Sequence, residues 1–254
     1  MGCALSIDAL HFVYKNKVAS EAAIASFRKY NPDSTYVVIC DGGDDYSELC
    51  KKYNCVYIHS QDNIGYPEKG FGYRKLQMLE YLRRFSAAVS LCKSSHILIM
   101  EDDVCVINSI EVPIDVEMYV TENCKHNYIH PSLLEFIRTA SGKPSDNHYG
   151  LGGGGIFKRE TYQMIYPYLI SFVGKNFDAI QQVYPTIGWT DCMNSIAFML
   201  AGKIHHFNPQ VYELGRWGED HRNKNYDGIE SLLSEKYSIL HHYKKHYSFG
   251  DSKP

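Results

Sequence analysis

Four short apolar segments that alternate with helix-length segments are the feature that most restricts the fold of this 254-residue chain. The strand-like segments lie at residues 10–14, 35–40, 55–58 and 96–100. The helix-like segments between them lie at residues 18–30, 46–53 and 72–90. The continuous Tyr-Val-Val-Ile run inside residues 35–40 is typical of a strand that is buried on both faces. Strands separated by helices predict an α/β fold with a mostly parallel central sheet.

The second half of the chain has a looser pattern. We expect residues 108–147, which contain three prolines, to be irregular, and residues 160–170 to form a helix. A further helix should begin at Thr190 or Asp191 as its N-cap and end before Gly202. No repeat or break in composition divides the chain, which predicts a single domain over residues 1–254.

Composition excludes several classes of protein. Hydrophobic residues make up 44% and charged residues 22% of the chain, which are ordinary values for a globular protein. The net charge of −3 argues against a nucleic-acid partner, because such proteins usually carry a basic face. No apolar run reaches the roughly 18–20 residues that span a bilayer, and the chain start does not resemble a secretory signal, so we expect a cytoplasmic protein.

Cysteine usage and the N-terminus give two further expectations. The eight cysteines are scattered without a CxxC pair, which favours reduced structural thiols over a zinc site. Residues 1–6 fit the myristoylation pattern M-G-x-x-x-[ST], with acylation at Gly2 and a second acyl chain on Cys3. The alternative is that Leu5 simply leads into the first strand.

Two acidic clusters follow predicted strands, namely Asp41 and the triplet Glu101-Asp102-Asp103. Ligands of parallel sheets bind beyond the carboxyl ends of strands, so both clusters point to a charged site. Three adjacent carboxylates repel one another unless a cation neutralises them, and oxygen ligands suit Mg²⁺ or Mn²⁺. Asp102 and Asp103 are the candidate metal ligands, and Glu101 could bind a ribose. The alternative is a surface turn capped by acids.

The strand followed by Glu101-Asp102-Asp103, preceded by the strand that ends at Asp41-Gly42-Gly43, resembles the GT-A glycosyltransferases that use nucleotide sugars. In that family a short acidic motif holds a divalent metal against the donor diphosphate. The acid that matches Asp41 commonly contacts the nucleotide base. The resemblance implies a nucleotide-binding half over about residues 1–107 and an acceptor-binding half over about residues 108–254.

A glycine-rich helix start also fits this resemblance. Asn63-Ile64-Gly65 and the segment 70–74 look like the place where a basic residue of the family meets the nucleotide. Lys69, Arg74 and Lys75 could receive a diphosphate at the helix N-terminus. The alternative is an ordinary amphipathic helix whose basic residues face water.

A second glycine-rich run lies at residues 152–155. The resemblance implies that it lines the donor-sugar pocket, with Gly153 and Gly154 offering close backbone approach. A flexible surface loop is the competing interpretation.

Asp191 matches the acid that serves inverting GT-A enzymes as general base, although the usual double acid is here Thr-Asp. The match favours inversion over retention; in a retaining enzyme Asp191 would orient a sugar instead. Trp189 is a candidate stacking face for a sugar ring. A purely structural cap is the alternative role of Asp191.

The C-terminal segment 237–246 resembles the late strand that supplies a last metal-ligating histidine and a basic residue for the diphosphate. Successive strand residues face opposite ways, so we expect only one of His241 and His242 to bind the metal. His242 is preferred, because its His-Tyr context is the closer resemblance. Lys245 is the matching basic residue, with Lys244 as second choice. The alternative is a solvated strand end.

These features together predict a glycosyltransferase that uses Mn²⁺ or Mg²⁺, a nucleotide-sugar donor (UDP-linked) and a glycan or glycoprotein acceptor. The sequence also resembles enzymes of large DNA viruses, which would place it in a host cytoplasm. One rival is a sugar-nucleotidyltransferase, which would normally have a glycine-rich loop after the first strand, where residues 14–17 have no glycine. The other is a non-catalytic module that binds glycan or metal.

Overall fold

The structure is a computed structural model of the chain. It describes residues 6–60, 64, 74–113, 115–121, 129–143, 149–184, 189–203, 205–215 and 224–247. Several residues singled out above lie outside these ranges: Gly2, Cys3, Asn63, Gly65, Lys69 and 70–73.

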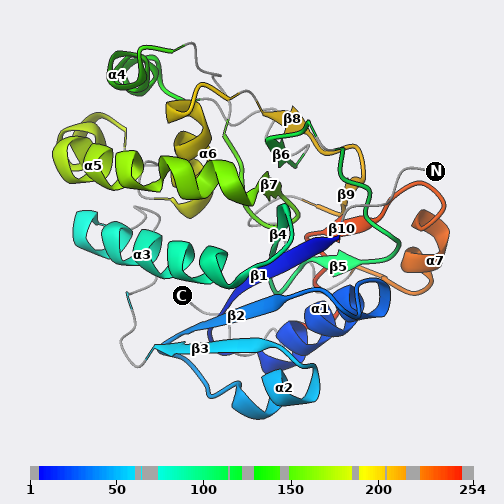
Figure 1. The fold of residues 1–254 in the computed structure, drawn as a ribbon. Coiled ribbons are helices and arrows are strands. Elements are labelled where there is room, and N and C mark those ends of the chain that lie inside the picture. The colour runs from blue at the N-terminus through cyan, green and yellow to red at the C-terminus, as the bar shows by residue number, and fades with distance from the viewer. Residues whose placement is uncertain are drawn as a thin grey trace.

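A seven-stranded sheet runs through the centre of the molecule (Figure 1). In spatial order its strands are β3 (Val56–Ser60), β2 (Tyr36–Asp41), β1 (Ile7–Val13), β4 (His96–Met100), β7 (Ile156–Lys158), β6 (Met118–Val120) and β8 (His206–Phe207). β1 to β4 pair in parallel, β7 is antiparallel to β4 and β6, and β8 is parallel to β6. Among the described strands of this sheet only β7 therefore runs against the others, which confirms the mostly parallel sheet.

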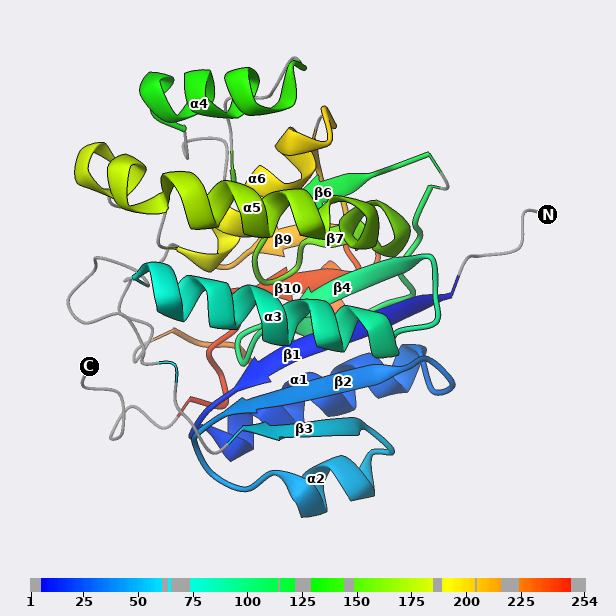
Figure 2. The same cartoon turned by 60° about the vertical axis from the view of Figure 1, so that its left-hand side comes forward.

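Helices cover both faces of this sheet, because alternate residues of its apolar strands point to opposite sides (Figure 2). Leu10, Val37 and Ile39 pack on one face against four helices: α3 (Lys75–Leu91), α4 (Pro131–Ser141), α5 (Arg159–Val183) and α6 (Thr190–Leu200). Ala9 and Val38 pack on the other face against two: α1 (Lys17–Tyr30) and α2 (Ser47–Lys52). Burial on both faces explains why the strands read as continuous apolar runs.

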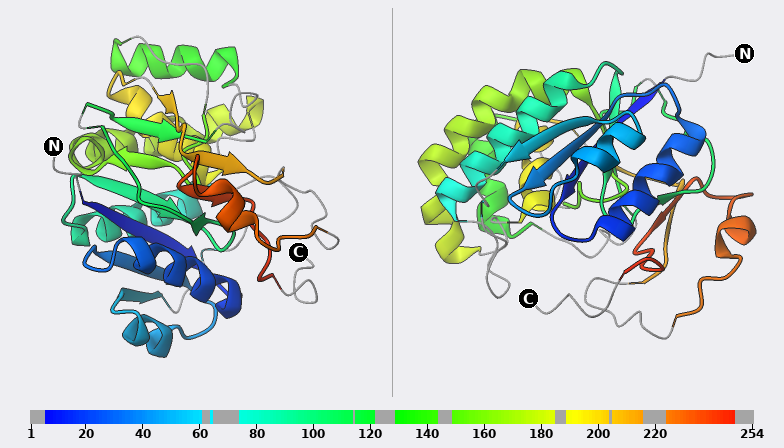
Figure 3. Two further views of the ribbon diagram at one scale, coloured as in Figure 1. Left: turned by 90° about the vertical axis from the view of Figure 1, so that its right-hand side faces the viewer. Right: turned by 90° about the horizontal axis from the view of Figure 1, so that it is seen from below.

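A small three-stranded sheet brings the C-terminal segment beside the acidic triplet (Figure 3). It consists of β5 (Cys105–Val106), β10 (Ile239–His241) and β9 (Val211–Glu213), and α7 (Ile229–Leu233) precedes β10 in the chain. β10 lies between the other two strands, antiparallel to β5 and parallel to β9. Since β5 follows the triplet by one residue, this pairing fixes where the late histidines lie. The backbone N–H of Tyr243 donates to the carbonyl of Asp103 at 2.8 Å.

The segment 108–147 is not irregular throughout, in contrast to the prediction. It contains β6 and the helix α4. Pro131 is the first residue of α4, where a missing N–H costs nothing, and Gly142 ends the helix with a φ of 64°. Leu133 and Ile137 are fully buried. The prolines of this segment suggest breaks in regular structure, but Pro131 begins a helix.

Helix α5 is longer than predicted, because it continues from Ile170 to Val183 and contains Pro167. Buried residues recur at helical spacing along the extension, namely Leu169, Phe172, Val173, Phe177 and Ile180. Burial of this apolar stripe against the core outweighs the cost of one proline, which is about 3 kcal/mol. The elements of the first hundred residues are confirmed, with ends shifted by a few residues.

Two other expectations concern thiols and membranes. The six cysteines within the described ranges are all free thiols, and four of them are buried. None of the described helices has both the length and the apolarity to cross a membrane.

Candidate active site

The acidic triplet follows the buried strand β4, and its members diverge. The backbone N–H of Val104 donates to the carbonyl of Glu101 at 3.0 Å, which closes a turn over the three acids. The carboxylates of Glu101 and Asp103 lie in one group with His241. Asp102 instead contacts His11 and Ser20, so the three side chains of the triplet lie in two different environments.

Asp102 is held by α1 and β1 rather than placed with the metal-ligating groups. Its Oδ1 accepts from the hydroxyl of Ser20 at 2.6 Å and lies 3.1 Å from Nε2 of His11. The other nitrogen of the buried His11 lies 3.0 Å from the hydroxyl of Tyr36. Asp102 therefore lies in neither group of described residues that could hold a metal ion, whereas Glu101 lies in one of them with Asp103.

Glu101, Asp103 and His241, which we call the acidic site, have ligand atoms that all lie within 4.8 Å of one another. Nε2 of His241 lies 3.9 Å from Oδ1 of Asp103. That Oδ1 is buried and has no hydrogen-bond partner among the described residues. A buried carboxylate oxygen without a partner is costly, and a cation is what would satisfy it. Two carboxylates and one imidazole fit Mn²⁺, and the oxygens also fit Mg²⁺.

His241 and His242 both enter this region, although the strand alternation predicted only one. β10 ends at His241, and His242 has a φ of 57°, so the alternation stops between them. Their ring centroids lie 4.1 Å apart. The positive φ at His242 had no signal in the sequence.

Glu213, which the sequence analysis did not single out, also contacts His241. It is paired with His241 in the register between β9 and β10. Nδ1 of His241 lies 2.9 Å from its Oε2 and 3.1 Å from its Oε1. An isolated glutamate in an irregular stretch carries no local signal, and only the strand pairing reveals it.

The charged groups around His241 shift one another's pKa values. Burial alone would lower the pKa of His241, but the hydrogen bond and charge of Glu213 raise it to about 9. Burial and then the charge of His241 lower the pKa of His242 to about 4. Desolvation, followed by the charge of Asp103, raises the pKa of Glu101 to about 7, although the side chain remains in contact with solvent. Without a metal ion, the proton on His241 is thus the main charge that offsets the carboxylates.

The glycine run packs tightly against the acidic site. The N–H of Gly153 donates to Oε1 of Glu101 at 2.9 Å, and a Cβ at Gly153 would lie only 2.8 Å from Cδ of Glu101. Gly154 has a φ of 79°, and its N–H donates to the carbonyl of Ile99. Both glycines are buried, and both N–H groups bond within the protein. Their role in the structure is close approach of the backbone to Glu101.

Asp191 lies in the first turn of α6 and borders the same loop. A Cβ at Gly152 would lie 3.3 Å from Cβ of Asp191 and 3.5 Å from Oε1 of Glu101. Burial raises the pKa of the Asp191 carboxyl. The N-cap of α6 is Trp189 without a side-chain cap bond, so the prediction that Thr190 or Asp191 caps the helix is wrong. Trp189 itself is half-buried and packs against the core.

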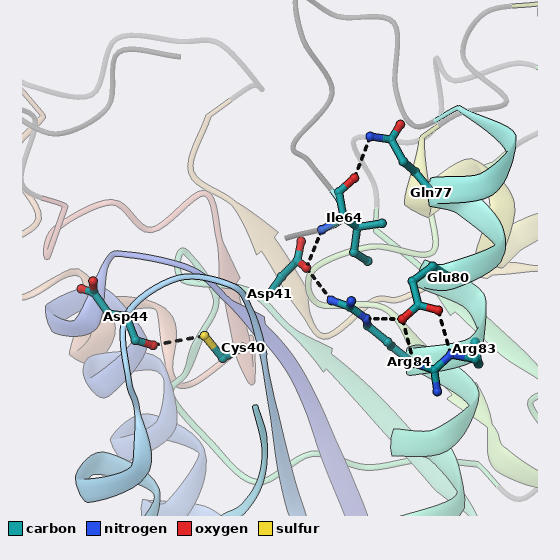
Figure 4. A network of polar contacts seen from close by, with 8 residues as sticks. All are labelled: Cys40, Asp41, Asp44, Ile64, Gln77, Glu80, Arg83 and Arg84. Atoms are coloured by element: carbon teal, nitrogen blue, oxygen red, sulfur yellow. Dashed lines mark hydrogen bonds and ion pairs between the residues drawn. The ribbon is translucent and has the colours of Figure 1, made fainter. Parts of the chain in front are cut away.

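The other predicted acid, Asp41, ends β2 and is neutralised by protein groups (Figure 4). Its Oδ1 accepts from Nη1 of Arg84 at 2.6 Å and from the N–H of Ile64 at 3.0 Å. Arg84 is 6% exposed, and its Nε donates to Glu80. Asp41 thus ties α3 and Ile64 to the end of the sheet.

The basic residues expected at the diphosphate lie at the surface. Arg74 is exposed at the start of α3, and its backbone N–H donates to Gln77. Lys75 pairs with Asp178. Lys245 is exposed, with Nζ at 3.4 Å from Glu230.

Comparison with known proteins bears on the fold. The sequence matches no protein-family model and no curated protein. An active-site mutant of LgtC superposes with a TM-score of 0.52 and 13% identity, covering 92% of this chain and 86% of that one. The galactosyltransferase LgtC in complex with donor and acceptor sugar analogues superposes with a TM-score of 0.50 and 12% identity, and the coverage of the two chains is the same. The bifunctional glycosyltransferase WbbM superposes with a TM-score of 0.48 and 10% identity, covering 95% of this chain and 46% of that one. The chain has the GT-A fold. At these identities the two LgtC structures establish the architecture, and the chemistry has to be argued from the site.

Proposed function

We propose that this protein is a metal-dependent glycosyltransferase that moves one sugar from a UDP-linked donor to a hydroxyl group of a glycan. The observation that carries the proposal is the convergence of Glu101, Asp103 and His241 beyond the carboxyl end of β4, with a buried Asp103 oxygen that lacks a partner among the described residues. In parallel sheets, ligands bind at that edge. The fold shared with LgtC supports glycosyl transfer as the chemistry.

The residues of the acidic site would hold Mn²⁺ or Mg²⁺, with His242 beside them. The bound ion would offset negative charge on the donor diphosphate. Lys245 is exposed and loosely paired, so its ammonium group can reach a diphosphate at small cost. Arg74 is the corresponding cation at the start of α3. Asp41 keeps one carboxylate oxygen for the nucleotide base while the other holds Arg84.

Asp191 is the proposed general base. Burial raises its carboxyl pKa, which makes it a stronger proton acceptor than an ordinary aspartate. It would take the proton of the acceptor hydroxyl while the acceptor oxygen bonds to the anomeric carbon. The bond from that carbon to the diphosphate breaks, and the nucleoside diphosphate leaves. This direct displacement inverts the anomeric centre, so NMR of the product tests it: a product with the donor's configuration would assign Asp191 to sugar orientation instead.

The rival functions make different demands. A nucleotidyltransferase would bind a nucleoside triphosphate and release pyrophosphate. A non-catalytic module would bind glycan equally well after Asp103→Asn, and would bind no nucleoside diphosphate.

The test is a calorimetric titration of the full chain with UDP, GDP, CDP and ADP, each with Mn²⁺ and with EDTA. We expect UDP to bind only with metal, and Asp103→Asn to lower its affinity at least about tenfold, or roughly 1.4 kcal/mol. Asp33→Asn is the matched control, because Asp33 is exposed in the turn after α1. Absence of binding by every diphosphate would overturn the proposal. Equal binding with EDTA would remove the metal from it.

A further inference from the structure

His241 has two ring nitrogens, and each faces a different set of ligands. Nε2 faces Asp103 of the acidic site, at 3.9 Å. Nδ1 faces Glu213, at 2.9 Å. On this second side His242 joins, with Nε2 at 3.9 Å from Oε2 of Glu213. The ring thus stands between two groups that are each rich in metal-ligating atoms.

Glu213, His241 and His242, which we call the histidine site, offer one carboxylate and two imidazoles within 4.8 Å of one another. Ligands that share one Zn²⁺ at about 2.0–2.2 Å lie roughly 3–3.5 Å apart. The separations of 2.9 and 3.9 Å bracket that value, so side-chain adjustments of a few tenths of an ångström suffice.

Two features of His242 point to a ligand. Its side chain is only 8% exposed, its Nε2 faces Glu213, and its buried Nδ1 has no hydrogen-bond partner among the described residues. Its φ of 57° is a left-handed conformation that few non-glycine residues adopt. An extended backbone would turn this ring away from His241. The conformation therefore keeps a buried, incompletely bonded imidazole beside two other ligands, a combination that folding alone does not favour.

We propose that Glu213, His241 and His242 form a second cation site, which shares only His241 with the acidic site and takes a transition metal such as Zn²⁺ or Co²⁺ in preference to Mg²⁺. Two imidazoles and one carboxylate favour these ions, whereas Mg²⁺ prefers oxygen ligands. The ion replaces the proton that lies between His241 and Glu213, and that proton goes to solvent. The side chain of Thr121 also bonds Glu213 and helps to hold the carboxylate in place.

The test measures metal binding alone, so it does not depend on sugar transfer. Untagged full-length protein is titrated with Zn²⁺ by calorimetry, and with Co²⁺ by visible absorption. In the acidic-site variant Glu101→Gln with Asp103→Asn, we expect one Zn²⁺ to bind with affinity within about threefold of the native protein. When Glu213→Gln or His242→Asn is added to this acidic-site variant, we expect affinity to fall by about 10–100-fold. His59→Asn is the matched control, because His59 is exposed on β3 and should change nothing.

The two test substitutions are chosen to preserve folding. Asn tolerates positive φ at position 242, and Gln keeps the size of Glu213 and an oxygen for Thr121. Circular dichroism checks each variant, and either variant alone is sufficient for the comparison.

The opposite pattern overturns the proposal. If Zn²⁺ binding is lost in the acidic-site variant and kept in Glu213→Gln and His242→Asn, then Glu213 only orients His241 for the acidic site. A thiolate-to-cobalt charge-transfer band would assign the ion to a cysteine instead. Failure of UDP binding in the previous experiment would leave both results unchanged.

Discussion

Two acidic strand ends look alike in the sequence and differ in their electrostatics. Asp41 at the end of β2 meets Arg84 and a backbone N–H, so its charge is satisfied within the protein (Figure 4). Glu101 and Asp103 after β4 meet no lysine or arginine in any described ion pair; their cationic neighbour is His241. The first cluster needs nothing further to be stable, whereas the second leaves a buried oxygen of Asp103 without a hydrogen-bond partner among the described residues. The comparison teaches that carboxylates at a sheet edge indicate a site only where the protein leaves them uncompensated.

The largest expected effect comes from breaking the compensated cluster. Arg84→Met should destabilise the protein by about 3–5 kcal/mol, because it leaves the Asp41 carboxylate largely buried without its partner. Urea unfolding followed by circular dichroism measures this loss. Arg83→Met removes an exposed partner of Glu80 and should cost about 0–1 kcal/mol. Equal losses in the two variants would show that Asp41 does not need Arg84.

The second prediction compares how removal of the charge at Asp103 and at Asp41 changes the stability of the protein. In EDTA, Asp103→Asn should change stability little, because loss of the repulsion from Glu101 offsets loss of the attraction to protonated His241, whereas Asp41→Asn should lower stability. At 100 times the dissociation constant, Mn²⁺ should stabilise the native protein by about 2.7 kcal/mol and Asp103→Asn by much less. Thermal unfolding with and without Mn²⁺ measures both. Destabilisation of Asp103→Asn in EDTA would mean that Asp103 is already paired.

A third variant tests the middle acid. His11→Phe should cost about 2 kcal/mol, because it leaves Asp102 and the hydroxyl of Tyr36 without their shared partner. Mn²⁺ affinity should change little, since Asp102 faces away from the acidic site. Urea unfolding and a Mn²⁺ titration report the two quantities, and His59→Phe serves as an exposed control. Loss of Mn²⁺ binding at unchanged stability would return Asp102 to the metal.

The smallest effect is a drift with pH in EDTA. The folded-state pKa of His241 is raised to about 9, above its unfolded value of 6.5. Its stabilising contribution is therefore complete below pH 6.5 and is lost as the pH rises through about 9. We expect a fall of about 2–4 °C in Tm over this range, corresponding to roughly 1 kcal/mol for a chain of this size. His241→Gln should show a flatter profile, and an equally steep one would assign the drift to another group.

Local pattern predicted the sheet well and the site only partly. The apolar runs of β2 and β4 and the acids that follow them are local features, because burial on both faces requires continuous apolar residues. Helix α4 was missed because Pro131 has opposite meanings inside a helix and at its first position. The sequence grouped Asp102 with Asp103, whereas the structure groups Glu101 with Asp103, because side-chain direction after a strand depends on the turn that follows.

By itself, the sequence determined that this chain would build a mostly parallel sheet with carboxylates at the carboxyl ends of two strands. Only the tertiary structure decided which carboxylate would be neutralised and which would face a histidine. Arg84 reaches Asp41 from α3, and Glu213 reaches His241 from a neighbouring strand 28 residues earlier. The physical reason is that the two effects act between residues at different separations along the chain. Apolar burial leaves a periodic pattern in adjacent residues, whereas charge compensation depends on distances of a few ångströms between residues far apart in the chain.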